Sequence, residues 1–206
     1  MPPWFIHLNN GERLLFYKIE GRGVLMDLDI EKVSFRRLRR EHLPQLYEWI
    51  TKEPPATRFW GYRQGSTYGQ FAQEFTDSIK GKDPVKPYII FYEETSIGYI
   101  QTYHWSDYPG CEKYEELQKA AGLDVLIGAK NFRNKGLGSR VLCKFLKEII
   151  FKDSKTQFCV TDPDVRNTVA IRAYEKTGFR KTRQVDEILD EPRPVMLMRV
   201  GRKEVK

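Results

Sequence analysis

The sequence predicts an α/β (α+β) fold in which about seven strands and about four helices build one sheet-centred domain. Residues 123–129 mostly alternate in side-chain character as a strand does, whereas residues 137–152 repeat apolar side chains at the spacing of an amphipathic helix. A turn with two glycines joins these two segments. Along the whole chain the expected elements follow the order β-α-α-β-β-β-α-β-α-β-β, which mixes helices and strands throughout.

Length and composition limit the broad class of protein. With 206 residues, the chain is long enough for one well-packed domain and short for two. An apolar content of 40% excludes a disordered chain, and no apolar run approaches the roughly 18 residues of a membrane span. Three widely spaced cysteines predict neither a disulfide framework nor a metal site, and the first residues lack a signal-peptide pattern. We therefore expect a cytoplasmic protein without a metal.

Three parts are expected along the chain. Residues 1–31 predict a β-hairpin appendage, because two short apolar stretches flank the pair Asn10 and Gly11, a strong hairpin-turn signal. Residues 32–200 form the main domain, and residues 201–206 are expected to be a solvated tail.

The first half of the main domain is expected to contain a strand, two helices and a β-hairpin, at residues 33–39, 41–50, 67–80 and 87–105. Thr67 and Gln70 have the spacing of a capping box at the start of the second helix. Between the helices, Phe59 and Trp60 stand beside Gly61 in a loop. These rings either fill the core or form a wall of a substrate pocket, since loops on rigid scaffolds often carry binding residues.

Residues 106–122 form a long connection whose charge is acidic. From position 107 to 124 there are five acids, including Asp107 and Glu112, against two lysines. A connection of this length is typical of a functional or mobile loop. We expect these acids to lie in the same cavity as other carboxylates of the site.

The glycine turn at residues 131–140 predicts an anion site. Gly136 and Gly138 let the backbone approach a ligand, and the helix that follows presents free amides and the positive end of its dipole. Eight basic residues against two acids between positions 130 and 155 agree with a phosphate ligand. The spacing matches neither a dinucleotide turn nor a nucleotide triphosphate loop, and the alternative is a tight turn on a basic surface helix.

The last third is expected to contain a strand at residues 156–161, a helix that includes residues 169–177, and two further strands at residues 179–185 and 195–200. Either Asp162 or Asp164 is expected to cap the helix, and Gly178 is expected to end it.

Two motifs in this order resemble the GNAT superfamily of acetyltransferases. The first is Arg133-x-x-Gly136-x-Gly138, and the second runs from Asn167 to Phe179 as Asn…Ala…Tyr-Glu-Lys-Thr-Gly-Phe. The resemblance covers about residues 33–200. It implies the GNAT fold, a mixed central sheet whose fourth and fifth strands splay apart, and acetyl-CoA as the cofactor. The residues it implies for the cofactor are Leu126, Ile127, Gly128, Arg133, Asn134, Lys135, Gly136, Leu137, Gly138, Ser139 and Asn167.

The same resemblance implies direct acetyl transfer to an amine within a ternary complex. Tyr174 would act as acid or hydrogen-bond donor at the sulfur, or else is a core tyrosine. Asp124 is a polar residue in an otherwise apolar strand, where a carboxylate is costly unless it serves a cation or a proton transfer. It is therefore the candidate base, with a strand-end salt bridge as the alternative. Asp162 follows the neighbouring strand and either binds the acceptor or caps a helix.

The pair of segments Gly122-Leu-Asp124 and Thr161-Asp162-Pro163 resembles bacterial aminoglycoside 6′-N-acetyltransferases, which implies a polycationic small-molecule amine as acceptor. The implied acceptor-binding residues are Trp60, Asp107, Glu112, Asp124 and Asp162. Siderophore acetyltransferases that act on N-hydroxylysine share the aromatic loop and are the alternative, although they generally carry a histidine at the position of Asp124. Outside this class, the alternatives are a GNAT module that binds acyl-CoA without turnover and a nucleic-acid-binding module. We expect no nucleic acid and no membrane partner, and a monomer or homodimer.

Overall fold

The computed structural model describes residues 28–52, 59, 66–189 and 191–206. The expected N-terminal hairpin lies almost entirely outside the described residues, and so does Trp60. The first regular element of the described residues is a 3-10 turn, Ile30–Lys32, which leads into the first strand.

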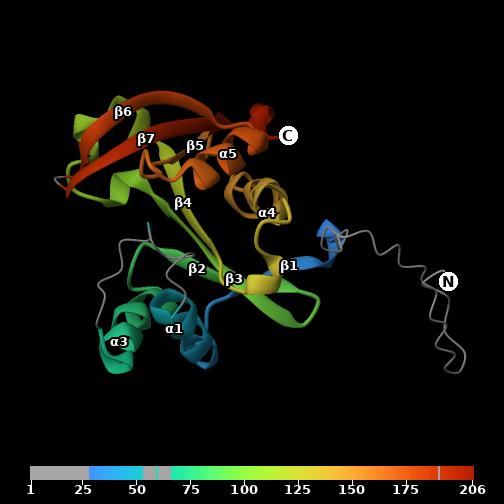
Figure 1. Ribbon diagram of the computed structural model, residues 1–206. Coiled ribbons are helices and arrows are strands. Elements are labelled where there is room, and N and C mark those ends of the chain that lie inside the picture. The colour runs from blue at the N-terminus through green and yellow to red at the C-terminus, as the bar shows by residue number, and fades with distance from the viewer. Residues whose placement is uncertain (1–27, 53–58, 60–65, 190) are drawn as a thin grey trace, which may run out of the picture.

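One mixed sheet organises the described part of the chain, with seven strands in the order β1-β2-β3-β4-β5-β7-β6 (Figure 1). The strands are β1 Val33–Arg37, β2 Lys86–Tyr92, β3 Thr95–His104, β4 Ala120–Ile127, β5 Phe158–Thr161, β6 Arg180–Ile188 and β7 Glu191–Gly201. Neighbouring strands run antiparallel, except that β4 and β5 are parallel. The predicted α/β class and the element order are therefore confirmed.

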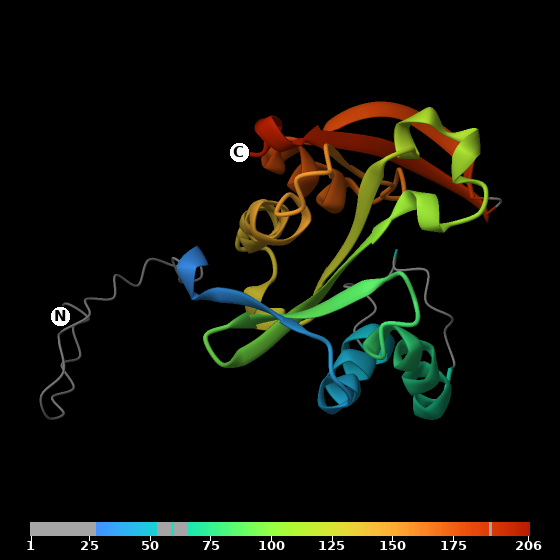
Figure 2. The same ribbon diagram turned by 180° about the vertical axis from the view of Figure 1, so that it is seen from behind.

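The helices cover both faces of the sheet (Figures 1 and 2). They are α1 Leu43–Lys52, α3 Tyr68–Ile79, α4 Leu137–Phe145 and α5 Thr168–Thr177, and α4 continues as a π-helical turn, Leu146–Ile150. Helices α1 and α3 pack in a cluster that includes Tyr99 and Leu126, whereas α4 and α5 pack in a larger cluster with Leu123. The alternation of β4 is thus confirmed, because neighbouring residues of this strand enter different clusters.

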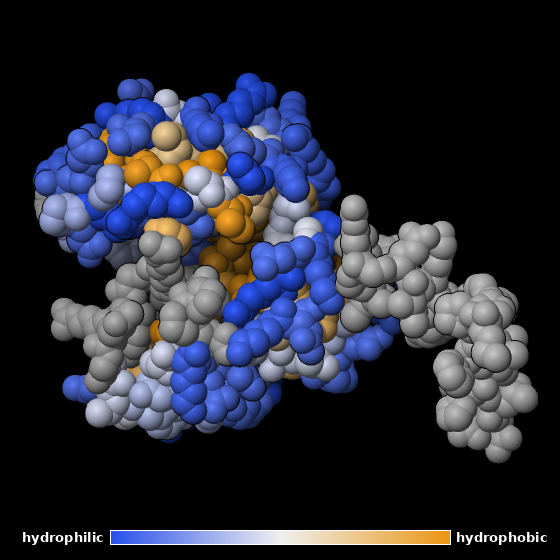
Figure 3. Space-filling view, in the orientation of Figure 1, coloured by the Kyte–Doolittle hydropathy of each residue, from blue (hydrophilic) through white to orange (hydrophobic). Residues whose placement is uncertain are grey.

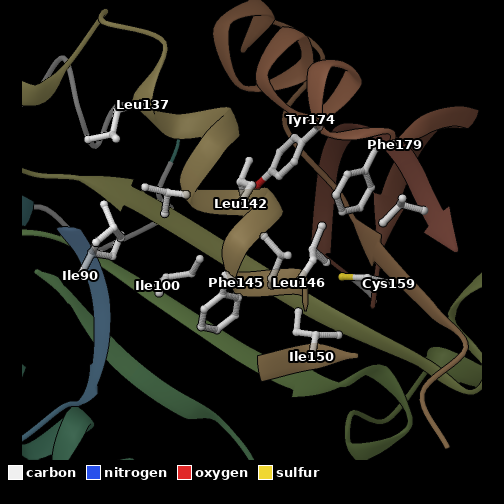
Figure 4. Packing of buried hydrophobic residues seen from close by; sticks show 14 of the residues in the cluster. Ile90, Ile100, Leu137, Leu142, Phe145, Leu146, Ile150, Cys159, Tyr174 and Phe179 are labelled. Carbon is white, nitrogen blue, oxygen red and sulfur yellow. The ribbon is translucent and has the colours of Figure 1, made fainter. Parts of the chain in front are cut away.

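Figure 4 shows how the larger cluster joins the sheet to α4 and α5. Phe145 and Leu146 are fully buried and meet residues of β2 and β3, including Ile90 and Ile100. Tyr174 of α5 lies against Phe179, with the ring centres 5.2 Å apart. The apolar stripe of α4 therefore fixes the helix, and with it the glycine turn, on the sheet.

Helix ends follow the expected capping chemistry in two cases and differ in a third. Thr67 and Gln70 form the predicted capping box of α3, and Gly178 ends α5 with φ of 112°. However, the cap of α5 is Asn167, whose side chain accepts from the amide of Ala170 at 3.2 Å. The prediction that Asp162 or Asp164 caps this helix is wrong.

Two expected irregular segments have more structure than their sequence patterns predict. The acidic connection contains three 3-10 turns, and β4 already begins at Ala120. Of the expected solvated tail, residues 201–206, Arg202, Lys203 and Lys206 are exposed, whereas Gly201 is buried and Val205 is half-buried. Gly201 closes β7, Val205 packs on the core, and Arg202 donates to the carbonyls of Phe151, Asp153 and Thr156.

The feature that positions the site is the separation of β4 from β5. Their pairing starts at Ala120 with Phe158 and ends at Gly122 with Val160, while β4 continues to Ile127. Beyond Gly122, no described strand pairs with the β5 side of β4. The splay implied by the resemblance is therefore confirmed, and it opens a crevice between the two halves of the sheet. None of the described helices has the length and apolarity needed to cross a bilayer.

Candidate active site

A cavity of about 460 Å³ lies at this crevice. Its walls come from β3, β4 and β5, the segments that follow β3 and β5, helix α5 and the hairpin that joins β6 to β7, together with Phe59. In the space-filling view, apolar side chains are visible inside a hollow near the centre of the face drawn in Figure 3. Strand ends and a helix start thus meet around one space that can hold a small molecule.

The cavity has an acidic lining. Among the described residues that form its walls, four are acids and one is a base: Asp124, Asp162, Asp164, Glu191 and Arg193. The structure therefore places the two predicted aspartates, Asp124 of β4 and Asp162 just after β5, in the wall of one cavity. Asp107 and Glu112 are exposed and do not line this cavity, because the 3-10 turns direct tyrosine and tryptophan side chains toward it instead.

Asp124 is held by a neutral hydrogen-bond chain. Gln101, its cross-strand neighbour, donates to Oδ2 of Asp124 at 2.8 Å. The hydroxyl of Tyr99 in turn donates to Oε1 of Gln101 at 2.6 Å, which sets the orientation of the amide. Burial raises the pKa of Asp124, while the hydrogen bond from Gln101 and the charge of Arg193 oppose this rise. This carboxylate makes no ion pair within the described part of the chain, so the alternative of a strand-end salt bridge is not observed there.

Asp162 has an ionic partner that the sequence pattern does not reveal. Nη2 of Arg193 donates to Oδ2 of Asp162 at 2.5 Å. Burial raises the pKa of Asp162 to about 7, Arg193 opposes this rise, and the nearby charge of Asp124 adds to it. A carboxyl with this pKa changes charge near neutral pH.

Tyr174 is both a core residue and part of the cavity wall. It is buried in the core beside Phe179 and also lines the cavity, where it hydrogen-bonds with Thr161. Burial raises the pKa of Tyr174 above its ordinary value, so the phenol stays protonated and can donate a hydrogen bond. Asn167 caps α5 and lines the same cavity.

The glycine turn presents open backbone at the start of α4. Gly136 has φ of 72°, a conformation that favours glycine, and Asn134 is also left-handed at 59°. A Cβ atom added at Gly136 or Gly138 would meet nothing within 4 Å, so the backbone here faces open space. The side chain of Leu137 is buried, which leaves only its backbone available to a ligand. Amides at the start of a helix suit an anion, as expected for this turn.

Several basic side chains near this turn are engaged within the protein. Arg133 donates to the carbonyls of Ile127 and Gly128, and Arg140 donates to the carbonyl of Leu28 at 2.6 Å. Lys144 forms an ion pair with Glu148 at 2.8 Å. Arg133 therefore fastens the turn to the end of β4, a structural role that the charge count alone does not reveal.

Close packing against Trp49 explains the glycine at position 128, directly after β4. A Cβ atom at Gly128 would lie 2.1 Å from the ring of Trp49. The adjacent Leu126 is buried on the α1 side of the sheet, while Ile127 is half-buried on the α4 side. These side chains thus secure the strand, and its backbone on the β5 side remains without a strand partner among the described residues. In the part of the chain that the structure describes, His, Cys, Asp and Glu form no cluster suited to a metal.

Comparison with known proteins agrees with this geometry. Residues 39–187 match the model of the acetyltransferase (GNAT) domain family. The chain is 30% identical over 152 residues to an aminoglycoside N(6′)-acetyltransferase type 1 from Klebsiella pneumoniae. The aligned residues make up 73% of this chain and 75% of that protein. A protein of the same description from Serratia marcescens gives the same values.

The fold is also similar to a crystal structure of aminoglycoside acetyltransferase AAC(6′)-Ib in complex with coenzyme A and kanamycin. The TM-score is 0.72 at 28% sequence identity, and the match covers 84% of this chain and 96% of that chain. The order of strands, the splayed pair, the glycine turn and the family match together lead to one assignment: this chain belongs to the GNAT family of N-acetyltransferases.

Proposed function

We propose that this chain transfers an acetyl group from acetyl-CoA to an amine of a polycationic, aminoglycoside-like small molecule. The observation that carries the proposal is the cavity beside the unpaired edge of β4, where four carboxylates face a space of about 460 Å³. A lining of this charge attracts several ammonium groups and disfavours neutral or acidic amines. The similar proteins named above are described as aminoglycoside acetyltransferases, which supports the same acceptor class.

Acetyl-CoA fits the other side of the crevice. Its pyrophosphate would bind the amides of the turn at residues 133–139, where added side-chain atoms at Gly136 and Gly138 meet open space. Its pantetheine arm and thioester carbonyl would lie along the backbone of 126–128, a form of oxyanion stabilisation, with Asn167 close to the arm. Similarity to structures that contain coenzyme A supports this placement.

The chemistry that follows uses Asp124 and Tyr174. The acceptor amine attacks the thioester carbonyl carbon, and its nitrogen loses a proton to the carboxylate of Asp124 directly or through a water. The C–S bond then breaks, and Tyr174 donates a proton or hydrogen bond to the leaving thiolate. The products are the N-acetylated acceptor and free coenzyme A. Asp162 adds a second carboxylate to the wall, although one of its oxygens already accepts from Arg193.

We propose further that the enzyme works in the cytoplasm as a monomer or homodimer, without nucleic acid. The three free cysteines support a reducing compartment.

The test is acetyl-CoA consumption by the purified protein with kanamycin, spermidine or N-hydroxylysine as acceptor. We expect kanamycin to have the highest kcat/KM of the three. A higher kcat/KM for N-hydroxylysine would replace the aminoglycoside-like acceptor by a siderophore precursor, and no turnover with any amine would point to an acyl-CoA-binding module.

A further inference from the structure

Arg193 stands out as the one base among the described residues that line the acidic cavity. It belongs to β7, just after the turn from β6, and its Nη2 atom lies 2.5 Å from Oδ2 of Asp162. Nη1 of the same guanidinium also donates to the backbone carbonyl of Asp162 at 3.4 Å. The Arg193 side chain is 38% exposed and that of Asp162 only 9%, so the cation stands between the buried carboxylate and solvent.

The other carboxylates of the cavity differ from Asp162 in their partners. Asp124 accepts from the neutral amide of Gln101. Asp164 pairs with Arg166, whose side chain is 69% exposed and does not line the cavity. Among the described residues of the cavity wall, Arg193 is therefore the cation that reduces the negative charge.

The groups around Asp162 come from several elements. Arg193 of β7 and Asp124 of β4 are the charged groups that act on its carboxyl, while Glu191 acts on Arg193. Tyr103 of β3 and Tyr174 of α5 both sense the charge of Asp162, and burial raises the pKa of each so that they remain neutral. The guanidinium thus offsets the negative charge of Asp162 whenever this carboxyl is ionised, and leaves that of Asp124 without an ionic partner among the described residues. A second ammonium placed beside Asp162 would meet a like charge.

We propose that Arg193 is a specificity-determining residue, a built-in counter-ion that occupies Asp162 and leaves Asp124 as the carboxylate open to the reacting amine. This proposal rests on the proposed function, because it concerns the acceptor subsite of the same cavity. In this role, Arg193 limits the number of ammonium groups that bind deep in the cavity. Acceptors with one ammonium near the reacting centre are accommodated, and a second one beside Asp162 is disfavoured.

The test is calorimetric binding of kanamycin, which carries several ammonium groups, and of glucosamine, which carries one. We expect Arg193→Gln to bind kanamycin on the order of tenfold more tightly than the wild type, because a like charge is removed from the subsite. Arg193→Lys keeps the charge and should resemble the wild type. Glucosamine affinity should change much less than kanamycin affinity in Arg193→Gln.

Arg183→Gln is the matched control. Arg183 lies on β6 of the same hairpin and makes a comparable two-bond pair with Glu116, outside the cavity. Removing its charge should leave both affinities unchanged. Equal tightening in Arg183→Gln would reduce the effect to net charge and overturn the proposal.

The double variant Asp162→Asn/Arg193→Gln covers the case in which Arg193→Gln does not fold. It removes both charges of the pair, so kanamycin affinity should stay close to that of the wild type. A loss of more than about tenfold would mean that Asp162 or Arg193 binds the acceptor directly, which overturns the proposal.

Binding without turnover separates this inference from the proposed function. If Arg193→Gln tightens kanamycin binding but no variant acetylates kanamycin, the proposed function fails and the counter-ion role stands. If the wild type acetylates kanamycin and Arg193→Gln leaves its affinity unchanged or weaker, the counter-ion role fails alone. Absence of kanamycin binding in both the wild type and Arg193→Gln also contradicts it.

Discussion

Gln101 faces Asp124 across the β3–β4 ladder and donates the hydrogen bond that favours the ionised carboxylate. Gln101→Leu removes this donor, so the pKa of Asp124 should rise. A base must be ionised, and the acidic limb of the kcat/KM profile should therefore move to higher pH by about one unit. The measurement is kcat/KM for the acceptor against pH.

Thr102→Val is the control for this prediction. Thr102 is the next residue of β3, is buried, and donates to the carbonyl of Gly122 instead. Its loss should lower stability and leave the pH profile in place. An acidic limb that stays in place in Gln101→Leu would remove Asp124 from the role of base.

The role of Tyr174 can be tested by removing only its hydroxyl group. Tyr174→Phe deletes the hydroxyl and keeps the ring that packs on Phe179, so folding should survive. We expect kcat to fall on the order of 10²-fold if the hydroxyl donates to the leaving thiolate. Tyr114→Phe is the control, because Tyr114 donates to the carbonyl of Glu187 in another cluster. Unchanged kcat in Tyr174→Phe would make this residue purely structural.

At the scale of single residues, sequence patterns identify the two aspartates of the site but not their hydrogen-bond partners. Asp124 is recognisable because it interrupts an apolar strand, and Asp162 because it follows one. Gln101 and Arg193 become partners only through strand register, across 23 and 31 positions of the chain respectively. No local spacing encodes such pairs. Gln101 is a polar residue in the largely apolar segment 97–105, a signal that could have identified it.

Among the elements, the glycine turn and α4 allow the clearest test. Gly138 lies in the first turn of α4 with no unusual φ, and an added side chain meets open space in the free protein. Gly138→Val should therefore fold and lose acetyl-CoA affinity, because the side chain would occupy the place of the pyrophosphate. Calorimetric titration with acetyl-CoA measures this loss.

Gly81→Ala serves as the control for a glycine with open surroundings. Gly81 has φ of 71° and lies after α3, away from the turn. Its replacement should cost about 1–2 kcal/mol of stability and leave acetyl-CoA affinity unchanged. Wild-type affinity in folded Gly138→Val would contradict the assignment of the turn.

Periodicity predicts the regular elements well and the short turns poorly. The β4 alternation and the α4 stripe are long enough to repeat, and both are confirmed. The acidic connection consists of 3-10 turns of three residues each, too short for any repeat to appear. This explains why Asp107 and Glu112 were expected in the cavity and lie outside it.

For the molecule as a whole, the end of the chain is attached to the sheet, because Gly201 ends β7 and Arg202 follows it directly. Arg202 connects the end of β7 to the segment after α4 through three backbone carbonyls. Arg202→Met should lower the free energy of unfolding by about 2 kcal/mol, since hydrogen bonds from a charged donor are lost. Urea denaturation measures this change.

Lys203→Met is the matched control, because Lys203 is exposed and follows Arg202 directly. It should leave the free energy of unfolding nearly unchanged. Equal stability of Arg202→Met and Lys203→Met would show that the contacts of Arg202 do not stabilise the fold. The charged and polar residues at the end of the chain do not indicate these contacts. They depend on backbone carbonyls that lie far from Arg202 in the sequence.

The fold thus places the exposed start of α4 on one side of the separated strands β4 and β5, and the acidic cavity on the other. The central claim is that Asp124 accepts the amine proton in this cavity. The most direct measurement compares kcat for kanamycin acetylation, together with acetyl-CoA affinity, in the wild type, Asp124→Asn and the exposed control Asp153→Asn. We expect kcat to fall by about 10²- to 10⁴-fold in Asp124→Asn alone, with acetyl-CoA affinity retained. Wild-type kcat in Asp124→Asn, or no kanamycin acetylation by the wild type, would contradict the account.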